Sequence, residues 1–583
     1  MRFSRMIPLI ATLACLFGIA SLCSSAGAQT YKDAERYPGK VISLPHGLTP
    51  EEMLILDEIG MRHRETPAPS AQPVRNAAEF DRMTGVLVRY PLGIGTSIIA
   101  EMSEDVLIYC CVTQGNLSAA SSAFTSGGVN MGNVIWFLCS TDSYWTRDYG
   151  PWFIYDDNHE CAVVDVIYNR PRPNDDEIPT EFADFLRMDA YGPDLITAGG
   201  NWMCDGHGIA ASSDLIWDEN SGKTHAEIDQ IVSDYLGIHT YHVVPDPNGT
   251  YIDHIDCWGK FLSVDKILIR EVPQSHSQYD EIEDVVDYFA AQNCSYGWPY
   301  EIVRVYTPNN QPYTNSLILN DKVLVPVTGS SWDDEALAAY EAAMPGYEVI
   351  GCTGSWVSTD ALHCRTHGVA DPGLLYVWLK PLLQTDAPGP YRVGAEIIDH
   401  SQTGLVTDSL RVYWRAGETG PWSYEVMTAI AGTDSFYADI PSQPPQTTVQ
   451  YYVFAADNSG RAETYPLVGA PGAFSFLVDT DPQSVEEWAG TETILMARVD
   501  SNPVRGAATI RFELGVPSRA SLRVFDHQGR FVRRIVNGRL EAGGHRARWD
   551  CTAQTGEQVA PGIYFYMLEA GGLAVTERLV VLP

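Results

Sequence analysis

The segment Ala361-Leu-His363-Cys364-Arg-Thr-His367-Gly368 places one thiol between two histidines and ends on a glycine. A cysteine acts as a nucleophile only as its thiolate, so it needs a base or a positively charged environment. The adjacent histidines could serve this purpose. Cys364-x-x-His367 also suggests a metal, but one cysteine and one histidine do not complete a four-ligand site. A buried cysteine without a chemical role is the simplest alternative, and earlier segments decide between these readings.

Two earlier segments pair carboxylates with an aromatic ring or an imidazole. In Trp145-Thr-Arg-Asp148, the ring and the carboxylate could hold a planar cation by a cation–π contact and a bidentate hydrogen bond. An aromatic corner of the core is the plainer alternative. In His254-Ile-Asp256, a strand would place both side chains on one face, where they form an acid–base pair.

Together these residue types suit a reaction on a guanidinium group. Asp148 and Asp256 would clamp the guanidinium from both sides while Cys364 attacks its central carbon. His254 would protonate the departing ammonia and then activate water to hydrolyse the thiouronium intermediate. No step requires a metal ion or an organic cofactor, so we expect neither.

The order of the motifs over residues 75–380 resembles the bacterial peptidylarginine deiminase and agmatine deiminase family. The resemblance implies a pentein fold, in which five ββαβ units surround a central site as a five-bladed α/β propeller. It also implies Cys364 as nucleophile, His254 as acid/base, and Asp148 and Asp256 as guanidinium-binding carboxylates. The motifs that carry it are Trp145-x-Arg-Asp148-x-Gly-Pro, Gly199-Gly-Asn201, Asp205-Gly-x-Gly208, His254-x-Asp256 and His363-Cys364-x-x-His367-Gly368.

The segment Asn169-Arg170-Pro-Arg172-Pro bears on the choice of substrate. Two arginines in a segment stiffened by prolines would converge on an anion. Agmatine has no carboxylate, whereas free arginine and peptides ending in arginine have one. The pair resembles that of Porphyromonas-type peptidylarginine deiminases, where it binds the α-carboxylate of a C-terminal arginine. Tyr251 and Asn315 also match positions near the substrate in that subfamily. The alternative is an ion pair of these arginines with Asp175, Asp176 or Glu177.

Residues 1–28 have the pattern of a secretory signal peptide. Arg2 and Arg5 precede an apolar run from Ile7 to Cys23, and Ala26-Gly-Ala28 predicts cleavage after Ala28. A membrane anchor is the alternative, but the apolar run is short for a span of ~20 residues. We therefore expect a protein that is secreted or held at the cell surface.

The rest of the chain divides into four predicted regions. Residues 29–75 form a leader with one short helix over Thr49–Met61, and residues 76–384 form the α/β catalytic domain. Residues 389–480 show short alternating runs typical of an immunoglobulin-like β-sandwich. Residues 488–583 are a second all-β domain that resembles sorting or flagellar-hook-type immunoglobulin-like domains, which implies export machinery as a partner. The predicted fold class is thus α+β, a pentein propeller followed by two all-β sandwiches.

The charge of the chain restricts the class of partner that it can bind. The chain carries 74 acidic and 38 basic residues, a formal net charge of −36. This charge argues against a nucleic-acid partner and favours encounter with cationic substrates. A solvated acidic surface is the simpler reading for most of these acids. No stretch after the signal is long and apolar enough to span a membrane.

The leading hypothesis is a secreted cysteine hydrolase that converts peptidyl-arginine, preferably at a C-terminus, to citrulline and ammonia. Its partners would be arginine-containing peptides or proteins. Deimination of agmatine, as in putrescine biosynthesis, or of free arginine is the first alternative. A surface adhesin with an inactive pentein scaffold and a papain-like protease are the others, and the paired carboxylates argue against both.

Overall fold

The computed structural model describes residues 44–382 and 389–478 and, with short gaps, residues 495–582. The predicted signal peptide, its cleavage point after Ala28, the first part of the leader and most of both linkers lie outside the described residues. Helices in the described part of the chain are all too short or too polar to cross a bilayer.

The catalytic region contains five sheets of three or four strands, and a separate two-stranded sheet of β7 and β9. Three of them share one pattern: an antiparallel pair of strands, a helical connection, and a third strand parallel to the second. The helices between the second and third strands are α7 (Leu215–Glu219) with α8 (His225–Leu236), α9 (Tyr279–Ala290) and α10 (Asp333–Ala343). The strands are β10 (Met203–Cys204), β11 (Ile209–Ser213), β12 (Thr240–Val244), β13 (Gly259–Ser263), β14 (Lys266–Glu271), β15 (Glu301–Tyr306), β16 (Leu317–Leu319), β17 (Lys322–Val327) and β18 (Glu348–Thr353).

The other two sheets extend the same unit by one strand each. They have the orders β1-β5-β6-β8 and β19-β2-β3-β4. Because β19 pairs with β2, the end of the catalytic region returns to its beginning. This fits the predicted succession of ββαβ units, while a closed five-bladed circle stays a prediction. The elements are β1 (Arg75–Asn76), β2 (Met83–Arg89), α2 (Thr96–Met102), β3 (Leu107–Val112), α3 (Leu117–Ser126), β4 (Val134–Leu138), α4 (Thr146–Tyr149), β5 (Trp152–Tyr155), β6 (Cys161–Val164), β7 (Ile167–Tyr168), α5 (Pro173–Asp176), α6 (Ile178–Leu186), β8 (Ala190–Tyr191), β9 (Ile196–Thr197) and β19 (His367–Ala370).

Local sequence explains why these elements form. Helix α8 begins at a capping box, in which Thr224 and Glu227 each accept from the other's backbone, and it ends at Gly237 in the left-handed conformation. Its buried residues Ile228, Val232 and Leu236 recur every fourth position and face the sheet. Strands β11 and β17 are buried throughout, as expected for strands covered on both faces.

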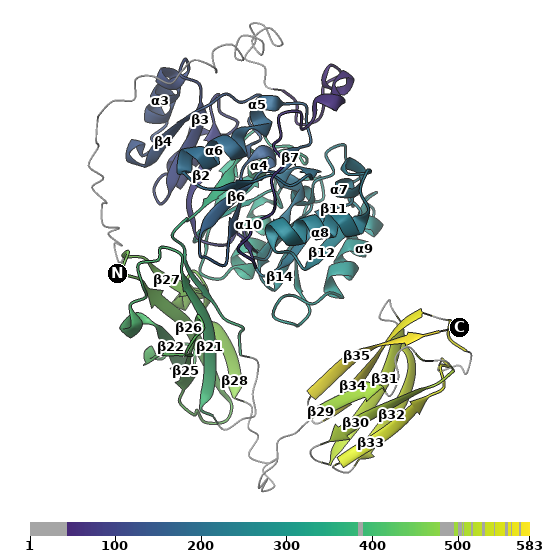
Figure 1. The fold of residues 1–583 in the computed structure, drawn as a ribbon. Coiled ribbons are helices and arrows are strands. Elements are labelled where there is room, and N and C mark those ends of the chain that lie inside the picture. The colour runs from purple at the N-terminus through teal and green to yellow at the C-terminus, as the bar shows by residue number, and fades with distance from the viewer. Residues whose placement is uncertain are drawn as a thin grey trace.

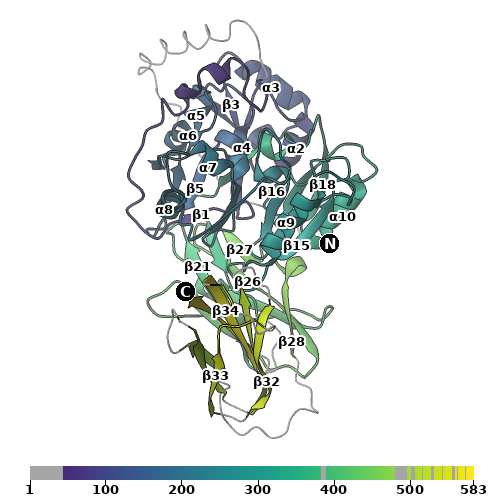
Figure 2. The same ribbon diagram turned by 90° about the vertical axis from the view of Figure 1, so that its right-hand side faces the viewer.

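The leader differs from its predicted helix over Thr49–Met61. The structure has two separate 3-10 turns there, Glu52–Leu54 and Leu56–Glu58. Met53 and Leu54 are 59% and 83% exposed, so no apolar face is packed that would hold a longer helix. Figures 1 and 2 show this dark purple start of the described chain at the end of the catalytic region far from the sandwich.

Residues 389–478 form the predicted antiparallel sandwich, with β20 of the catalytic region added to it. β20 pairs with β21, so the described boundary lies earlier than residue 384. Ion pairs of Arg82 with Glu463 and of Arg461 with Asp371 tie the sandwich to the catalytic region. The strands are β20 (Leu375–Trp378), β21 (Tyr391–Asp399), β22 (Arg411–Ala416), β23 (Ser423–Val426), β24 (Thr428–Ala429), β25 (Ser435–Ile440), β26 (Thr447–Ala456), β27 (Ala462–Tyr465) and β28 (Phe474–Val478).

The C-terminal region is all-β, as predicted. Its two antiparallel sheets have the orders β29-β30-β33 and β32-β31-β34-β35 and share one apolar core. The strands are β29 (Leu495–Val499), β30 (Ala508–Leu514), β31 (Ser518–Asp526), β32 (Phe531–Leu540), β33 (Gly543–Trp549), β34 (Gly562–Ala570) and β35 (Leu573–Val581).

Candidate active site

Cys364 lies in a 3-10 turn over His363–Arg365, immediately before β19, and its side chain is fully buried. Asn315 holds this turn in place. Its Nδ2 donates to Cys364 Sγ at 3.2 Å, its Oδ1 accepts from the Cys364 amide at 3.3 Å, and its carbonyl accepts from the His363 amide. Contact of Asn315 with the substrate stays a prediction, and in the structure this side chain binds the nucleophile.

The environment keeps Cys364 protonated while no substrate is bound. Burial raises the pKa of the thiol well above its ordinary value, and the Asp256 carboxylate, 3.6 Å from Sγ, raises it further. A cation placed next to the sulfur would oppose both effects. The geometry therefore suits a nucleophile that ionises when a positively charged group enters the site.

Asp148 in α4 and His254 face each other across the site. His254 Nδ1 lies 3.6 Å from Asp148 Oδ1. The approach is close because Gly200 has no side chain: a Cβ there would lie 2.5 Å from His254 Nδ1 and 2.7 Å from Asp148 Oδ1. Asn201 Oδ1 accepts from the Ser213 and Ile255 amides and so fixes the loop that carries His254. The Gly-Gly-Asn motif thus builds the site.

The prediction that His254 and Asp256 lie on one strand is wrong. His254 is extended, but the chain then turns into a 3-10 helix over Ile255–Cys257. The turn follows because the Asn201 side chain accepts the Ile255 amide, which is then not available to a sheet. The structure nevertheless brings both side chains to the same buried site.

Charge is distributed unevenly between these groups. Burial opposes ionisation of Asp148, but His46 and His254 outweigh it and hold its pKa at about 2. Burial lowers the pKa of His254 to about 4, against the pull of Asp148 and Asp256. At neutral pH, His254 is therefore a neutral base beside an ionised carboxylate. Within the described chain neither of its ring nitrogens has a hydrogen-bond partner.

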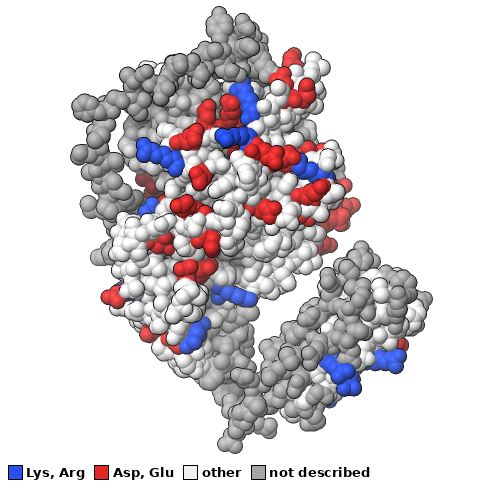
Figure 3. Space-filling model, viewed as in Figure 1, with Lys and Arg blue, Asp and Glu red and all other residues white. Residues whose placement is uncertain are grey.

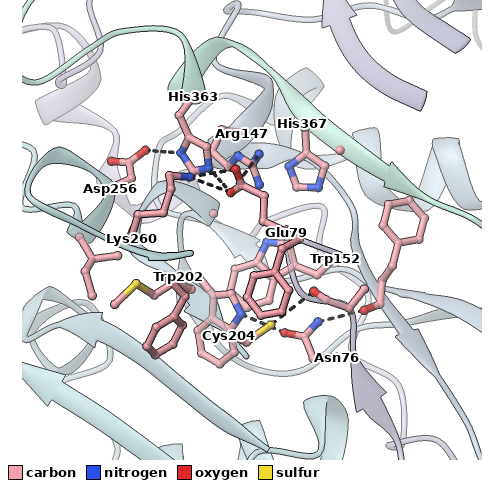
Figure 4. Close-up of a pocket in the computed structure, with 18 of the residues that line it drawn as sticks. Asn76, Glu79, Arg147, Trp152, Trp202, Cys204, Asp256, Lys260, His363 and His367 are labelled. Atoms are coloured by element: carbon pink, nitrogen blue, oxygen red, sulfur yellow. Dashed lines mark hydrogen bonds and ion pairs between the residues drawn. The ribbon is translucent and has the colours of Figure 1, made fainter. Parts of the chain in front are cut away.

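Asp256 is held by a charged cluster behind the site (Figure 4). His363 donates from Nδ1 to Asp256 at 2.7 Å and from Nε2 to Glu79 at 2.6 Å. Since both acceptors are carboxylates, both ring nitrogens carry protons and His363 is a cation. Lys260 and Arg147 also approach Glu79, at 2.9 and 3.7 Å. These side chains line a cavity of about 80 Å³.

The most informative neighbour of the site comes from the leader. His46 donates from Nε2 to Asp148 at 2.6 Å and from Nδ1 to the Thr359 carbonyl at 2.8 Å. Both partners are acceptors only, so His46 is an imidazolium. It stacks on Trp145 with ring centroids 4.9 Å apart and planes at 9°. A planar cation thus occupies the place that sequence analysis assigned to a guanidinium between Trp145 and Asp148.

Arg170 and Arg172, in the loop between β7 and α5, also bind the leader. Arg172 donates from Nε to Glu52 at 2.8 Å and from Nη2 to the Pro45 carbonyl at 2.8 Å. Arg170 Nε approaches the His46 carbonyl at 3.4 Å. The alternative of an ion pair between Arg172 and the acids at 175–177 is therefore wrong, because the carboxylate on Arg172 is that of Glu52.

Tyr251 lies at the rim of the site and is 69% exposed. Its hydroxyl is 3.4 Å from the Thr359 hydroxyl, and its ring lies against Gly47 of the leader. Donor atoms of His46, Asp148 and His254 also lie within 4.8 Å of one another, close enough to share a metal ion. Because both His46 nitrogens are protonated donors here, that imidazole offers a metal no lone pair.

Sequence reasoning missed His46, Glu52 and Glu79. His46 stands in Leu-Pro-His-Gly, without a periodic or motif signal. Thr49-x-x-Glu52 has the form of a capping box and does make those bonds, with Thr49 and Glu52 bonding each other's backbone amides. That local signal explains the turn but not the long-range contact with Arg172.

A family model matches most of the catalytic region. Residues 94–369 match the family model of the Porphyromonas-type peptidyl-arginine deiminases. This part of the chain is a domain of that family. It is thus a pentein-type guanidino-group deiminase, a hydrolase of C–N bonds in amidines. Residues 500–572 match the FlgD Ig-like domain, which agrees with the predicted C-terminal domain.

Individual relatives of the deiminase domain are distant. The agmatine deiminase of Medicago truncatula is 23% identical over 287 residues, 39% of this chain and 76% of that protein. The agmatine deiminase of Pseudomonas aeruginosa is 22% identical over 304 residues, 44% of this chain and 81% of that protein. The solved agmatine deiminase of Enterococcus faecalis is 18% identical with a TM-score of 0.48, covering 53% of this chain and 99% of that one.

Proposed function

We propose that the protein is a secreted peptidylarginine deiminase that prefers C-terminal arginine and forms citrulline and ammonia. One observation carries the proposal. The site already holds a planar cation against Trp145 and Asp148, and Arg172 beside it holds a carboxylate. An arginine with a free α-carboxylate presents the same two groups, whereas agmatine presents only the cation.

The proposed reaction uses the side chains as the structure places them. A guanidinium bound by Asp148 and Asp256 lowers the pKa of the Cys364 thiol, and the thiol proton passes to neutral His254. The thiolate sulfur then bonds to the guanidinium carbon. The carbon–nitrogen bond breaks as His254 returns the proton to the departing ammonia, which leaves a thiouronium on Cys364.

Hydrolysis completes the cycle. Water enters where ammonia left, gives a proton to His254 and bonds to the same carbon. The carbon–sulfur bond breaks as His254 gives its proton to the sulfur. The new hydroxyl then loses its own proton, which converts ammonia to ammonium, and citrulline is released. In sum, a guanidinium and water become a ureido group and ammonium. His254 carries the protons exchanged with the thiol, the departing ammonia and the attacking water, in agreement with its unpartnered ring nitrogens among the described residues.

A substrate panel tests the proposal. Ammonia and citrulline are measured with one peptide ending in arginine, the same peptide amidated at its C-terminus, a peptide with internal arginine, free arginine and agmatine. A charge-assisted hydrogen bond contributes about 1.5–3 kcal/mol, so kcat/KM should favour the free acid over the amide by roughly 10–150-fold. Turnover of agmatine above all peptides would favour the agmatine alternative instead.

Arg172→Ala should abolish the preference for the acid, and the exposed Arg187→Ala is the matched control. The ratio of acid to amide is the readout because Arg172 also binds the leader, which changes the absolute rate. An unchanged ratio in Arg172→Ala would refute the role of this arginine. Absence of ammonia from every substrate, both with the intact chain and with a chain cut between Leu54 and Met61, would refute the activity.

The proposal also covers where the protein acts, outside the cytoplasm, and how its sheets are arranged around the site. The signal sequence over residues 1–28 and the FlgD Ig-like domain support delivery outside the cytoplasm through export machinery. Acidic side chains are spread over the catalytic region in Figure 3 with basic ones interspersed, which supports a cationic rather than a nucleic-acid partner. The five sheets would surround the site as blades. Cell fractionation, with a variant lacking residues 2–28 as control, tests the location.

A further inference from the structure

We propose that residues 44–52 are an intramolecular pseudosubstrate, which closes the deiminase site until this segment is detached. The inference rests on the proposed function in one respect, that the site binding His46 is the one that binds the substrate guanidinium. It goes beyond that function because it assigns a partner to the site, a segment of the same chain, and makes the full chain an inactive precursor.

The first observation is the chemistry of His46. It presents a planar cation, stacks on Trp145, and donates hydrogen bonds in the ring plane to Asp148 and to the Thr359 carbonyl. One ring nitrogen lies within 4.8 Å of Cys364 Sγ. An imidazolium shares charge, planarity and donor geometry with a guanidinium. It lacks the carbon bearing two amino groups, so the thiol has no group to displace.

The second observation concerns the carboxylate subsite. Glu52 lies on Arg172 through two contacts, Oε1 to Nε at 2.8 Å and Oε2 to Nη2 at 3.3 Å. Both side chains are buried, with exposures of 0% for Arg172 and 1% for Glu52. Burial alone would raise the pKa of Glu52, but its contacts with Arg172 and Thr49 outweigh burial and lower the pKa. The segment thus supplies both groups of the proposed substrate, six residues apart.

The third observation is that the segment covers the nucleophile. Leu44 packs with Trp145 and Cys364 in one apolar cluster, and the exposures are 5%, 1% and 0%. Arg172 also holds the backbone of the segment, because its Nη2 donates to the carbonyls of Pro45 and Gly47. A substrate cannot reach Asp148 or the thiol while these residues are in place, so binding of leader and substrate is mutually exclusive.

The attachment of the leader makes this block effective. A tethered ligand has an effective concentration on the order of 1 mM. If the free segment binds with a Kd of about 10 µM, chains with a closed site outnumber chains with an open site by roughly 100 to 1. Cutting the chain removes this advantage, and the segment then dissociates on dilution.

The structure also shows where a cut would release the segment. Beyond Glu52 the chain is held again by the Arg62–Glu177 ion pair and by hydrogen bonds between Thr66 and Gly192. Between these anchors Leu54 and Met61 are 83% and 72% exposed. Exposed stretches of this kind are the usual sites of proteolysis. Cleavage there would free residues 44–52 and leave strand β1 and the fold in place.

The test uses the full chain with a recognition sequence for a site-specific protease placed between Leu54 and Met61. Alkylation of Cys364 by 2-chloroacetamidine, whose amidinium supplies the cation that the thiol needs to ionise, is followed by mass spectrometry before and after the cut. We expect labelling and deimination to rise by roughly 100-fold after cleavage and dilution. Unchanged labelling of Cys364 in the cut chain would overturn the inference.

Point variants and a free peptide complete the test. His46→Ala and Glu52→Gln should each raise Cys364 labelling in the uncut chain at least several-fold, while the exposed Leu54→Ala should not. A synthetic peptide of residues 44–54 should protect Cys364 in the cut chain, and the same peptide with His46→Ala should not. Equal protection by both peptides would also overturn the inference.

Labelling separates this inference from the proposed function. If cleavage exposes Cys364 but no guanidinium compound is hydrolysed, the pseudosubstrate stands and the deiminase proposal fails. If the uncut chain deiminates arginine as fast as the cut chain, the deiminase proposal stands and the pseudosubstrate fails.

Discussion

Glu79→Gln tests how much the charged cluster behind the nucleophile contributes to the fold. Glu79 accepts from His363 at 2.6 Å and from Lys260 at 2.9 Å, and Arg147 lies 3.7 Å away. These contacts lower its pKa well below the ordinary value despite the opposing effect of burial. Glutamine keeps the shape of the side chain but removes its charge, so three buried cations lose the carboxylate they share (Figure 4).

The expected cost follows from these contacts. Removing one partner of a buried ion pair costs about 3–5 kcal/mol. Because the Glu79 side chain is 18% exposed toward the cavity, we take the lower end of that range, about 3 kcal/mol. A domain of this size loses about 2 °C of melting temperature per kcal/mol, so the catalytic transition should fall by about 6 °C.

Differential scanning calorimetry of the full chain measures this shift. Glu101→Gln is the matched control, since Glu101 pairs with Lys322 near the surface with 33% of its side chain exposed. Such pairs contribute about 0–1 kcal/mol, so the control should move by about 2 °C or less. Lys260→Met combined with Glu79→Gln should cost less than the sum of the single changes. Equal shifts in Glu79→Gln and Glu101→Gln, or strict additivity with Lys260→Met, would refute this account.

Three further predictions concern the front of the site. In the chain cut between Leu54 and Met61, Trp145→Leu should raise KM by roughly 10-fold through loss of about 1–2 kcal/mol of cation–π contact, and Trp145→Phe should recover most of it in the same steady-state assay. Asn315→Ala should lower kcat by roughly 10–100-fold with little change in KM, because it frees the turn that carries Cys364; an equal rise in KM would contradict a positioning role. His254 has a folded pKa of about 4, below the unfolded value of 6.5, so the unfolded state gains a proton first as the pH falls. Stability is complete above pH 6.5 and declines toward pH 4 by about 3 kcal/mol, and His254→Gln should flatten this decline in melting curves across that range.

Sequence predicted the reactive centre because its residues carry their signal locally. Cys364, His254, Asp148 and Asp256 each stand in a short motif with glycine or a second reactive group nearby, and the structure brings all four together. Gly200 shows why such motifs predict a site: any side chain there would collide with His254 and Asp148, so the position requires glycine. The secondary structure around His254 was mispredicted because a side chain 53 residues earlier, Asn201, decides it.

The partner of Arg172 could not be predicted in this way. Two prolines and two arginines indicated an anion site, and the structure does place a carboxylate there. Its source is Glu52, 120 residues earlier, in a segment without apolar periodicity. Short polar segments owe their position to a few specific contacts rather than to a pattern of burial, so their sequence shows little of where they dock.

The two carboxylates of the site differ in one respect that the sequence could not reveal. Asp256 is paired with His363, whose other nitrogen is fixed by Glu79, so its cation is a permanent part of the domain. Asp148 is paired with His46, which belongs to a detachable segment. Without that segment, Asp148 would lose its hydrogen-bonded cation and keep a neutral imidazole and the charge of Arg170 as neighbours, so a new cation in the place of His46 would stabilise it. Asp148 is therefore the carboxylate of the site that a ligand cation stabilises most. Trp145 and Arg172, which would bind the planar face and the carboxylate of the ligand, lie on the same side.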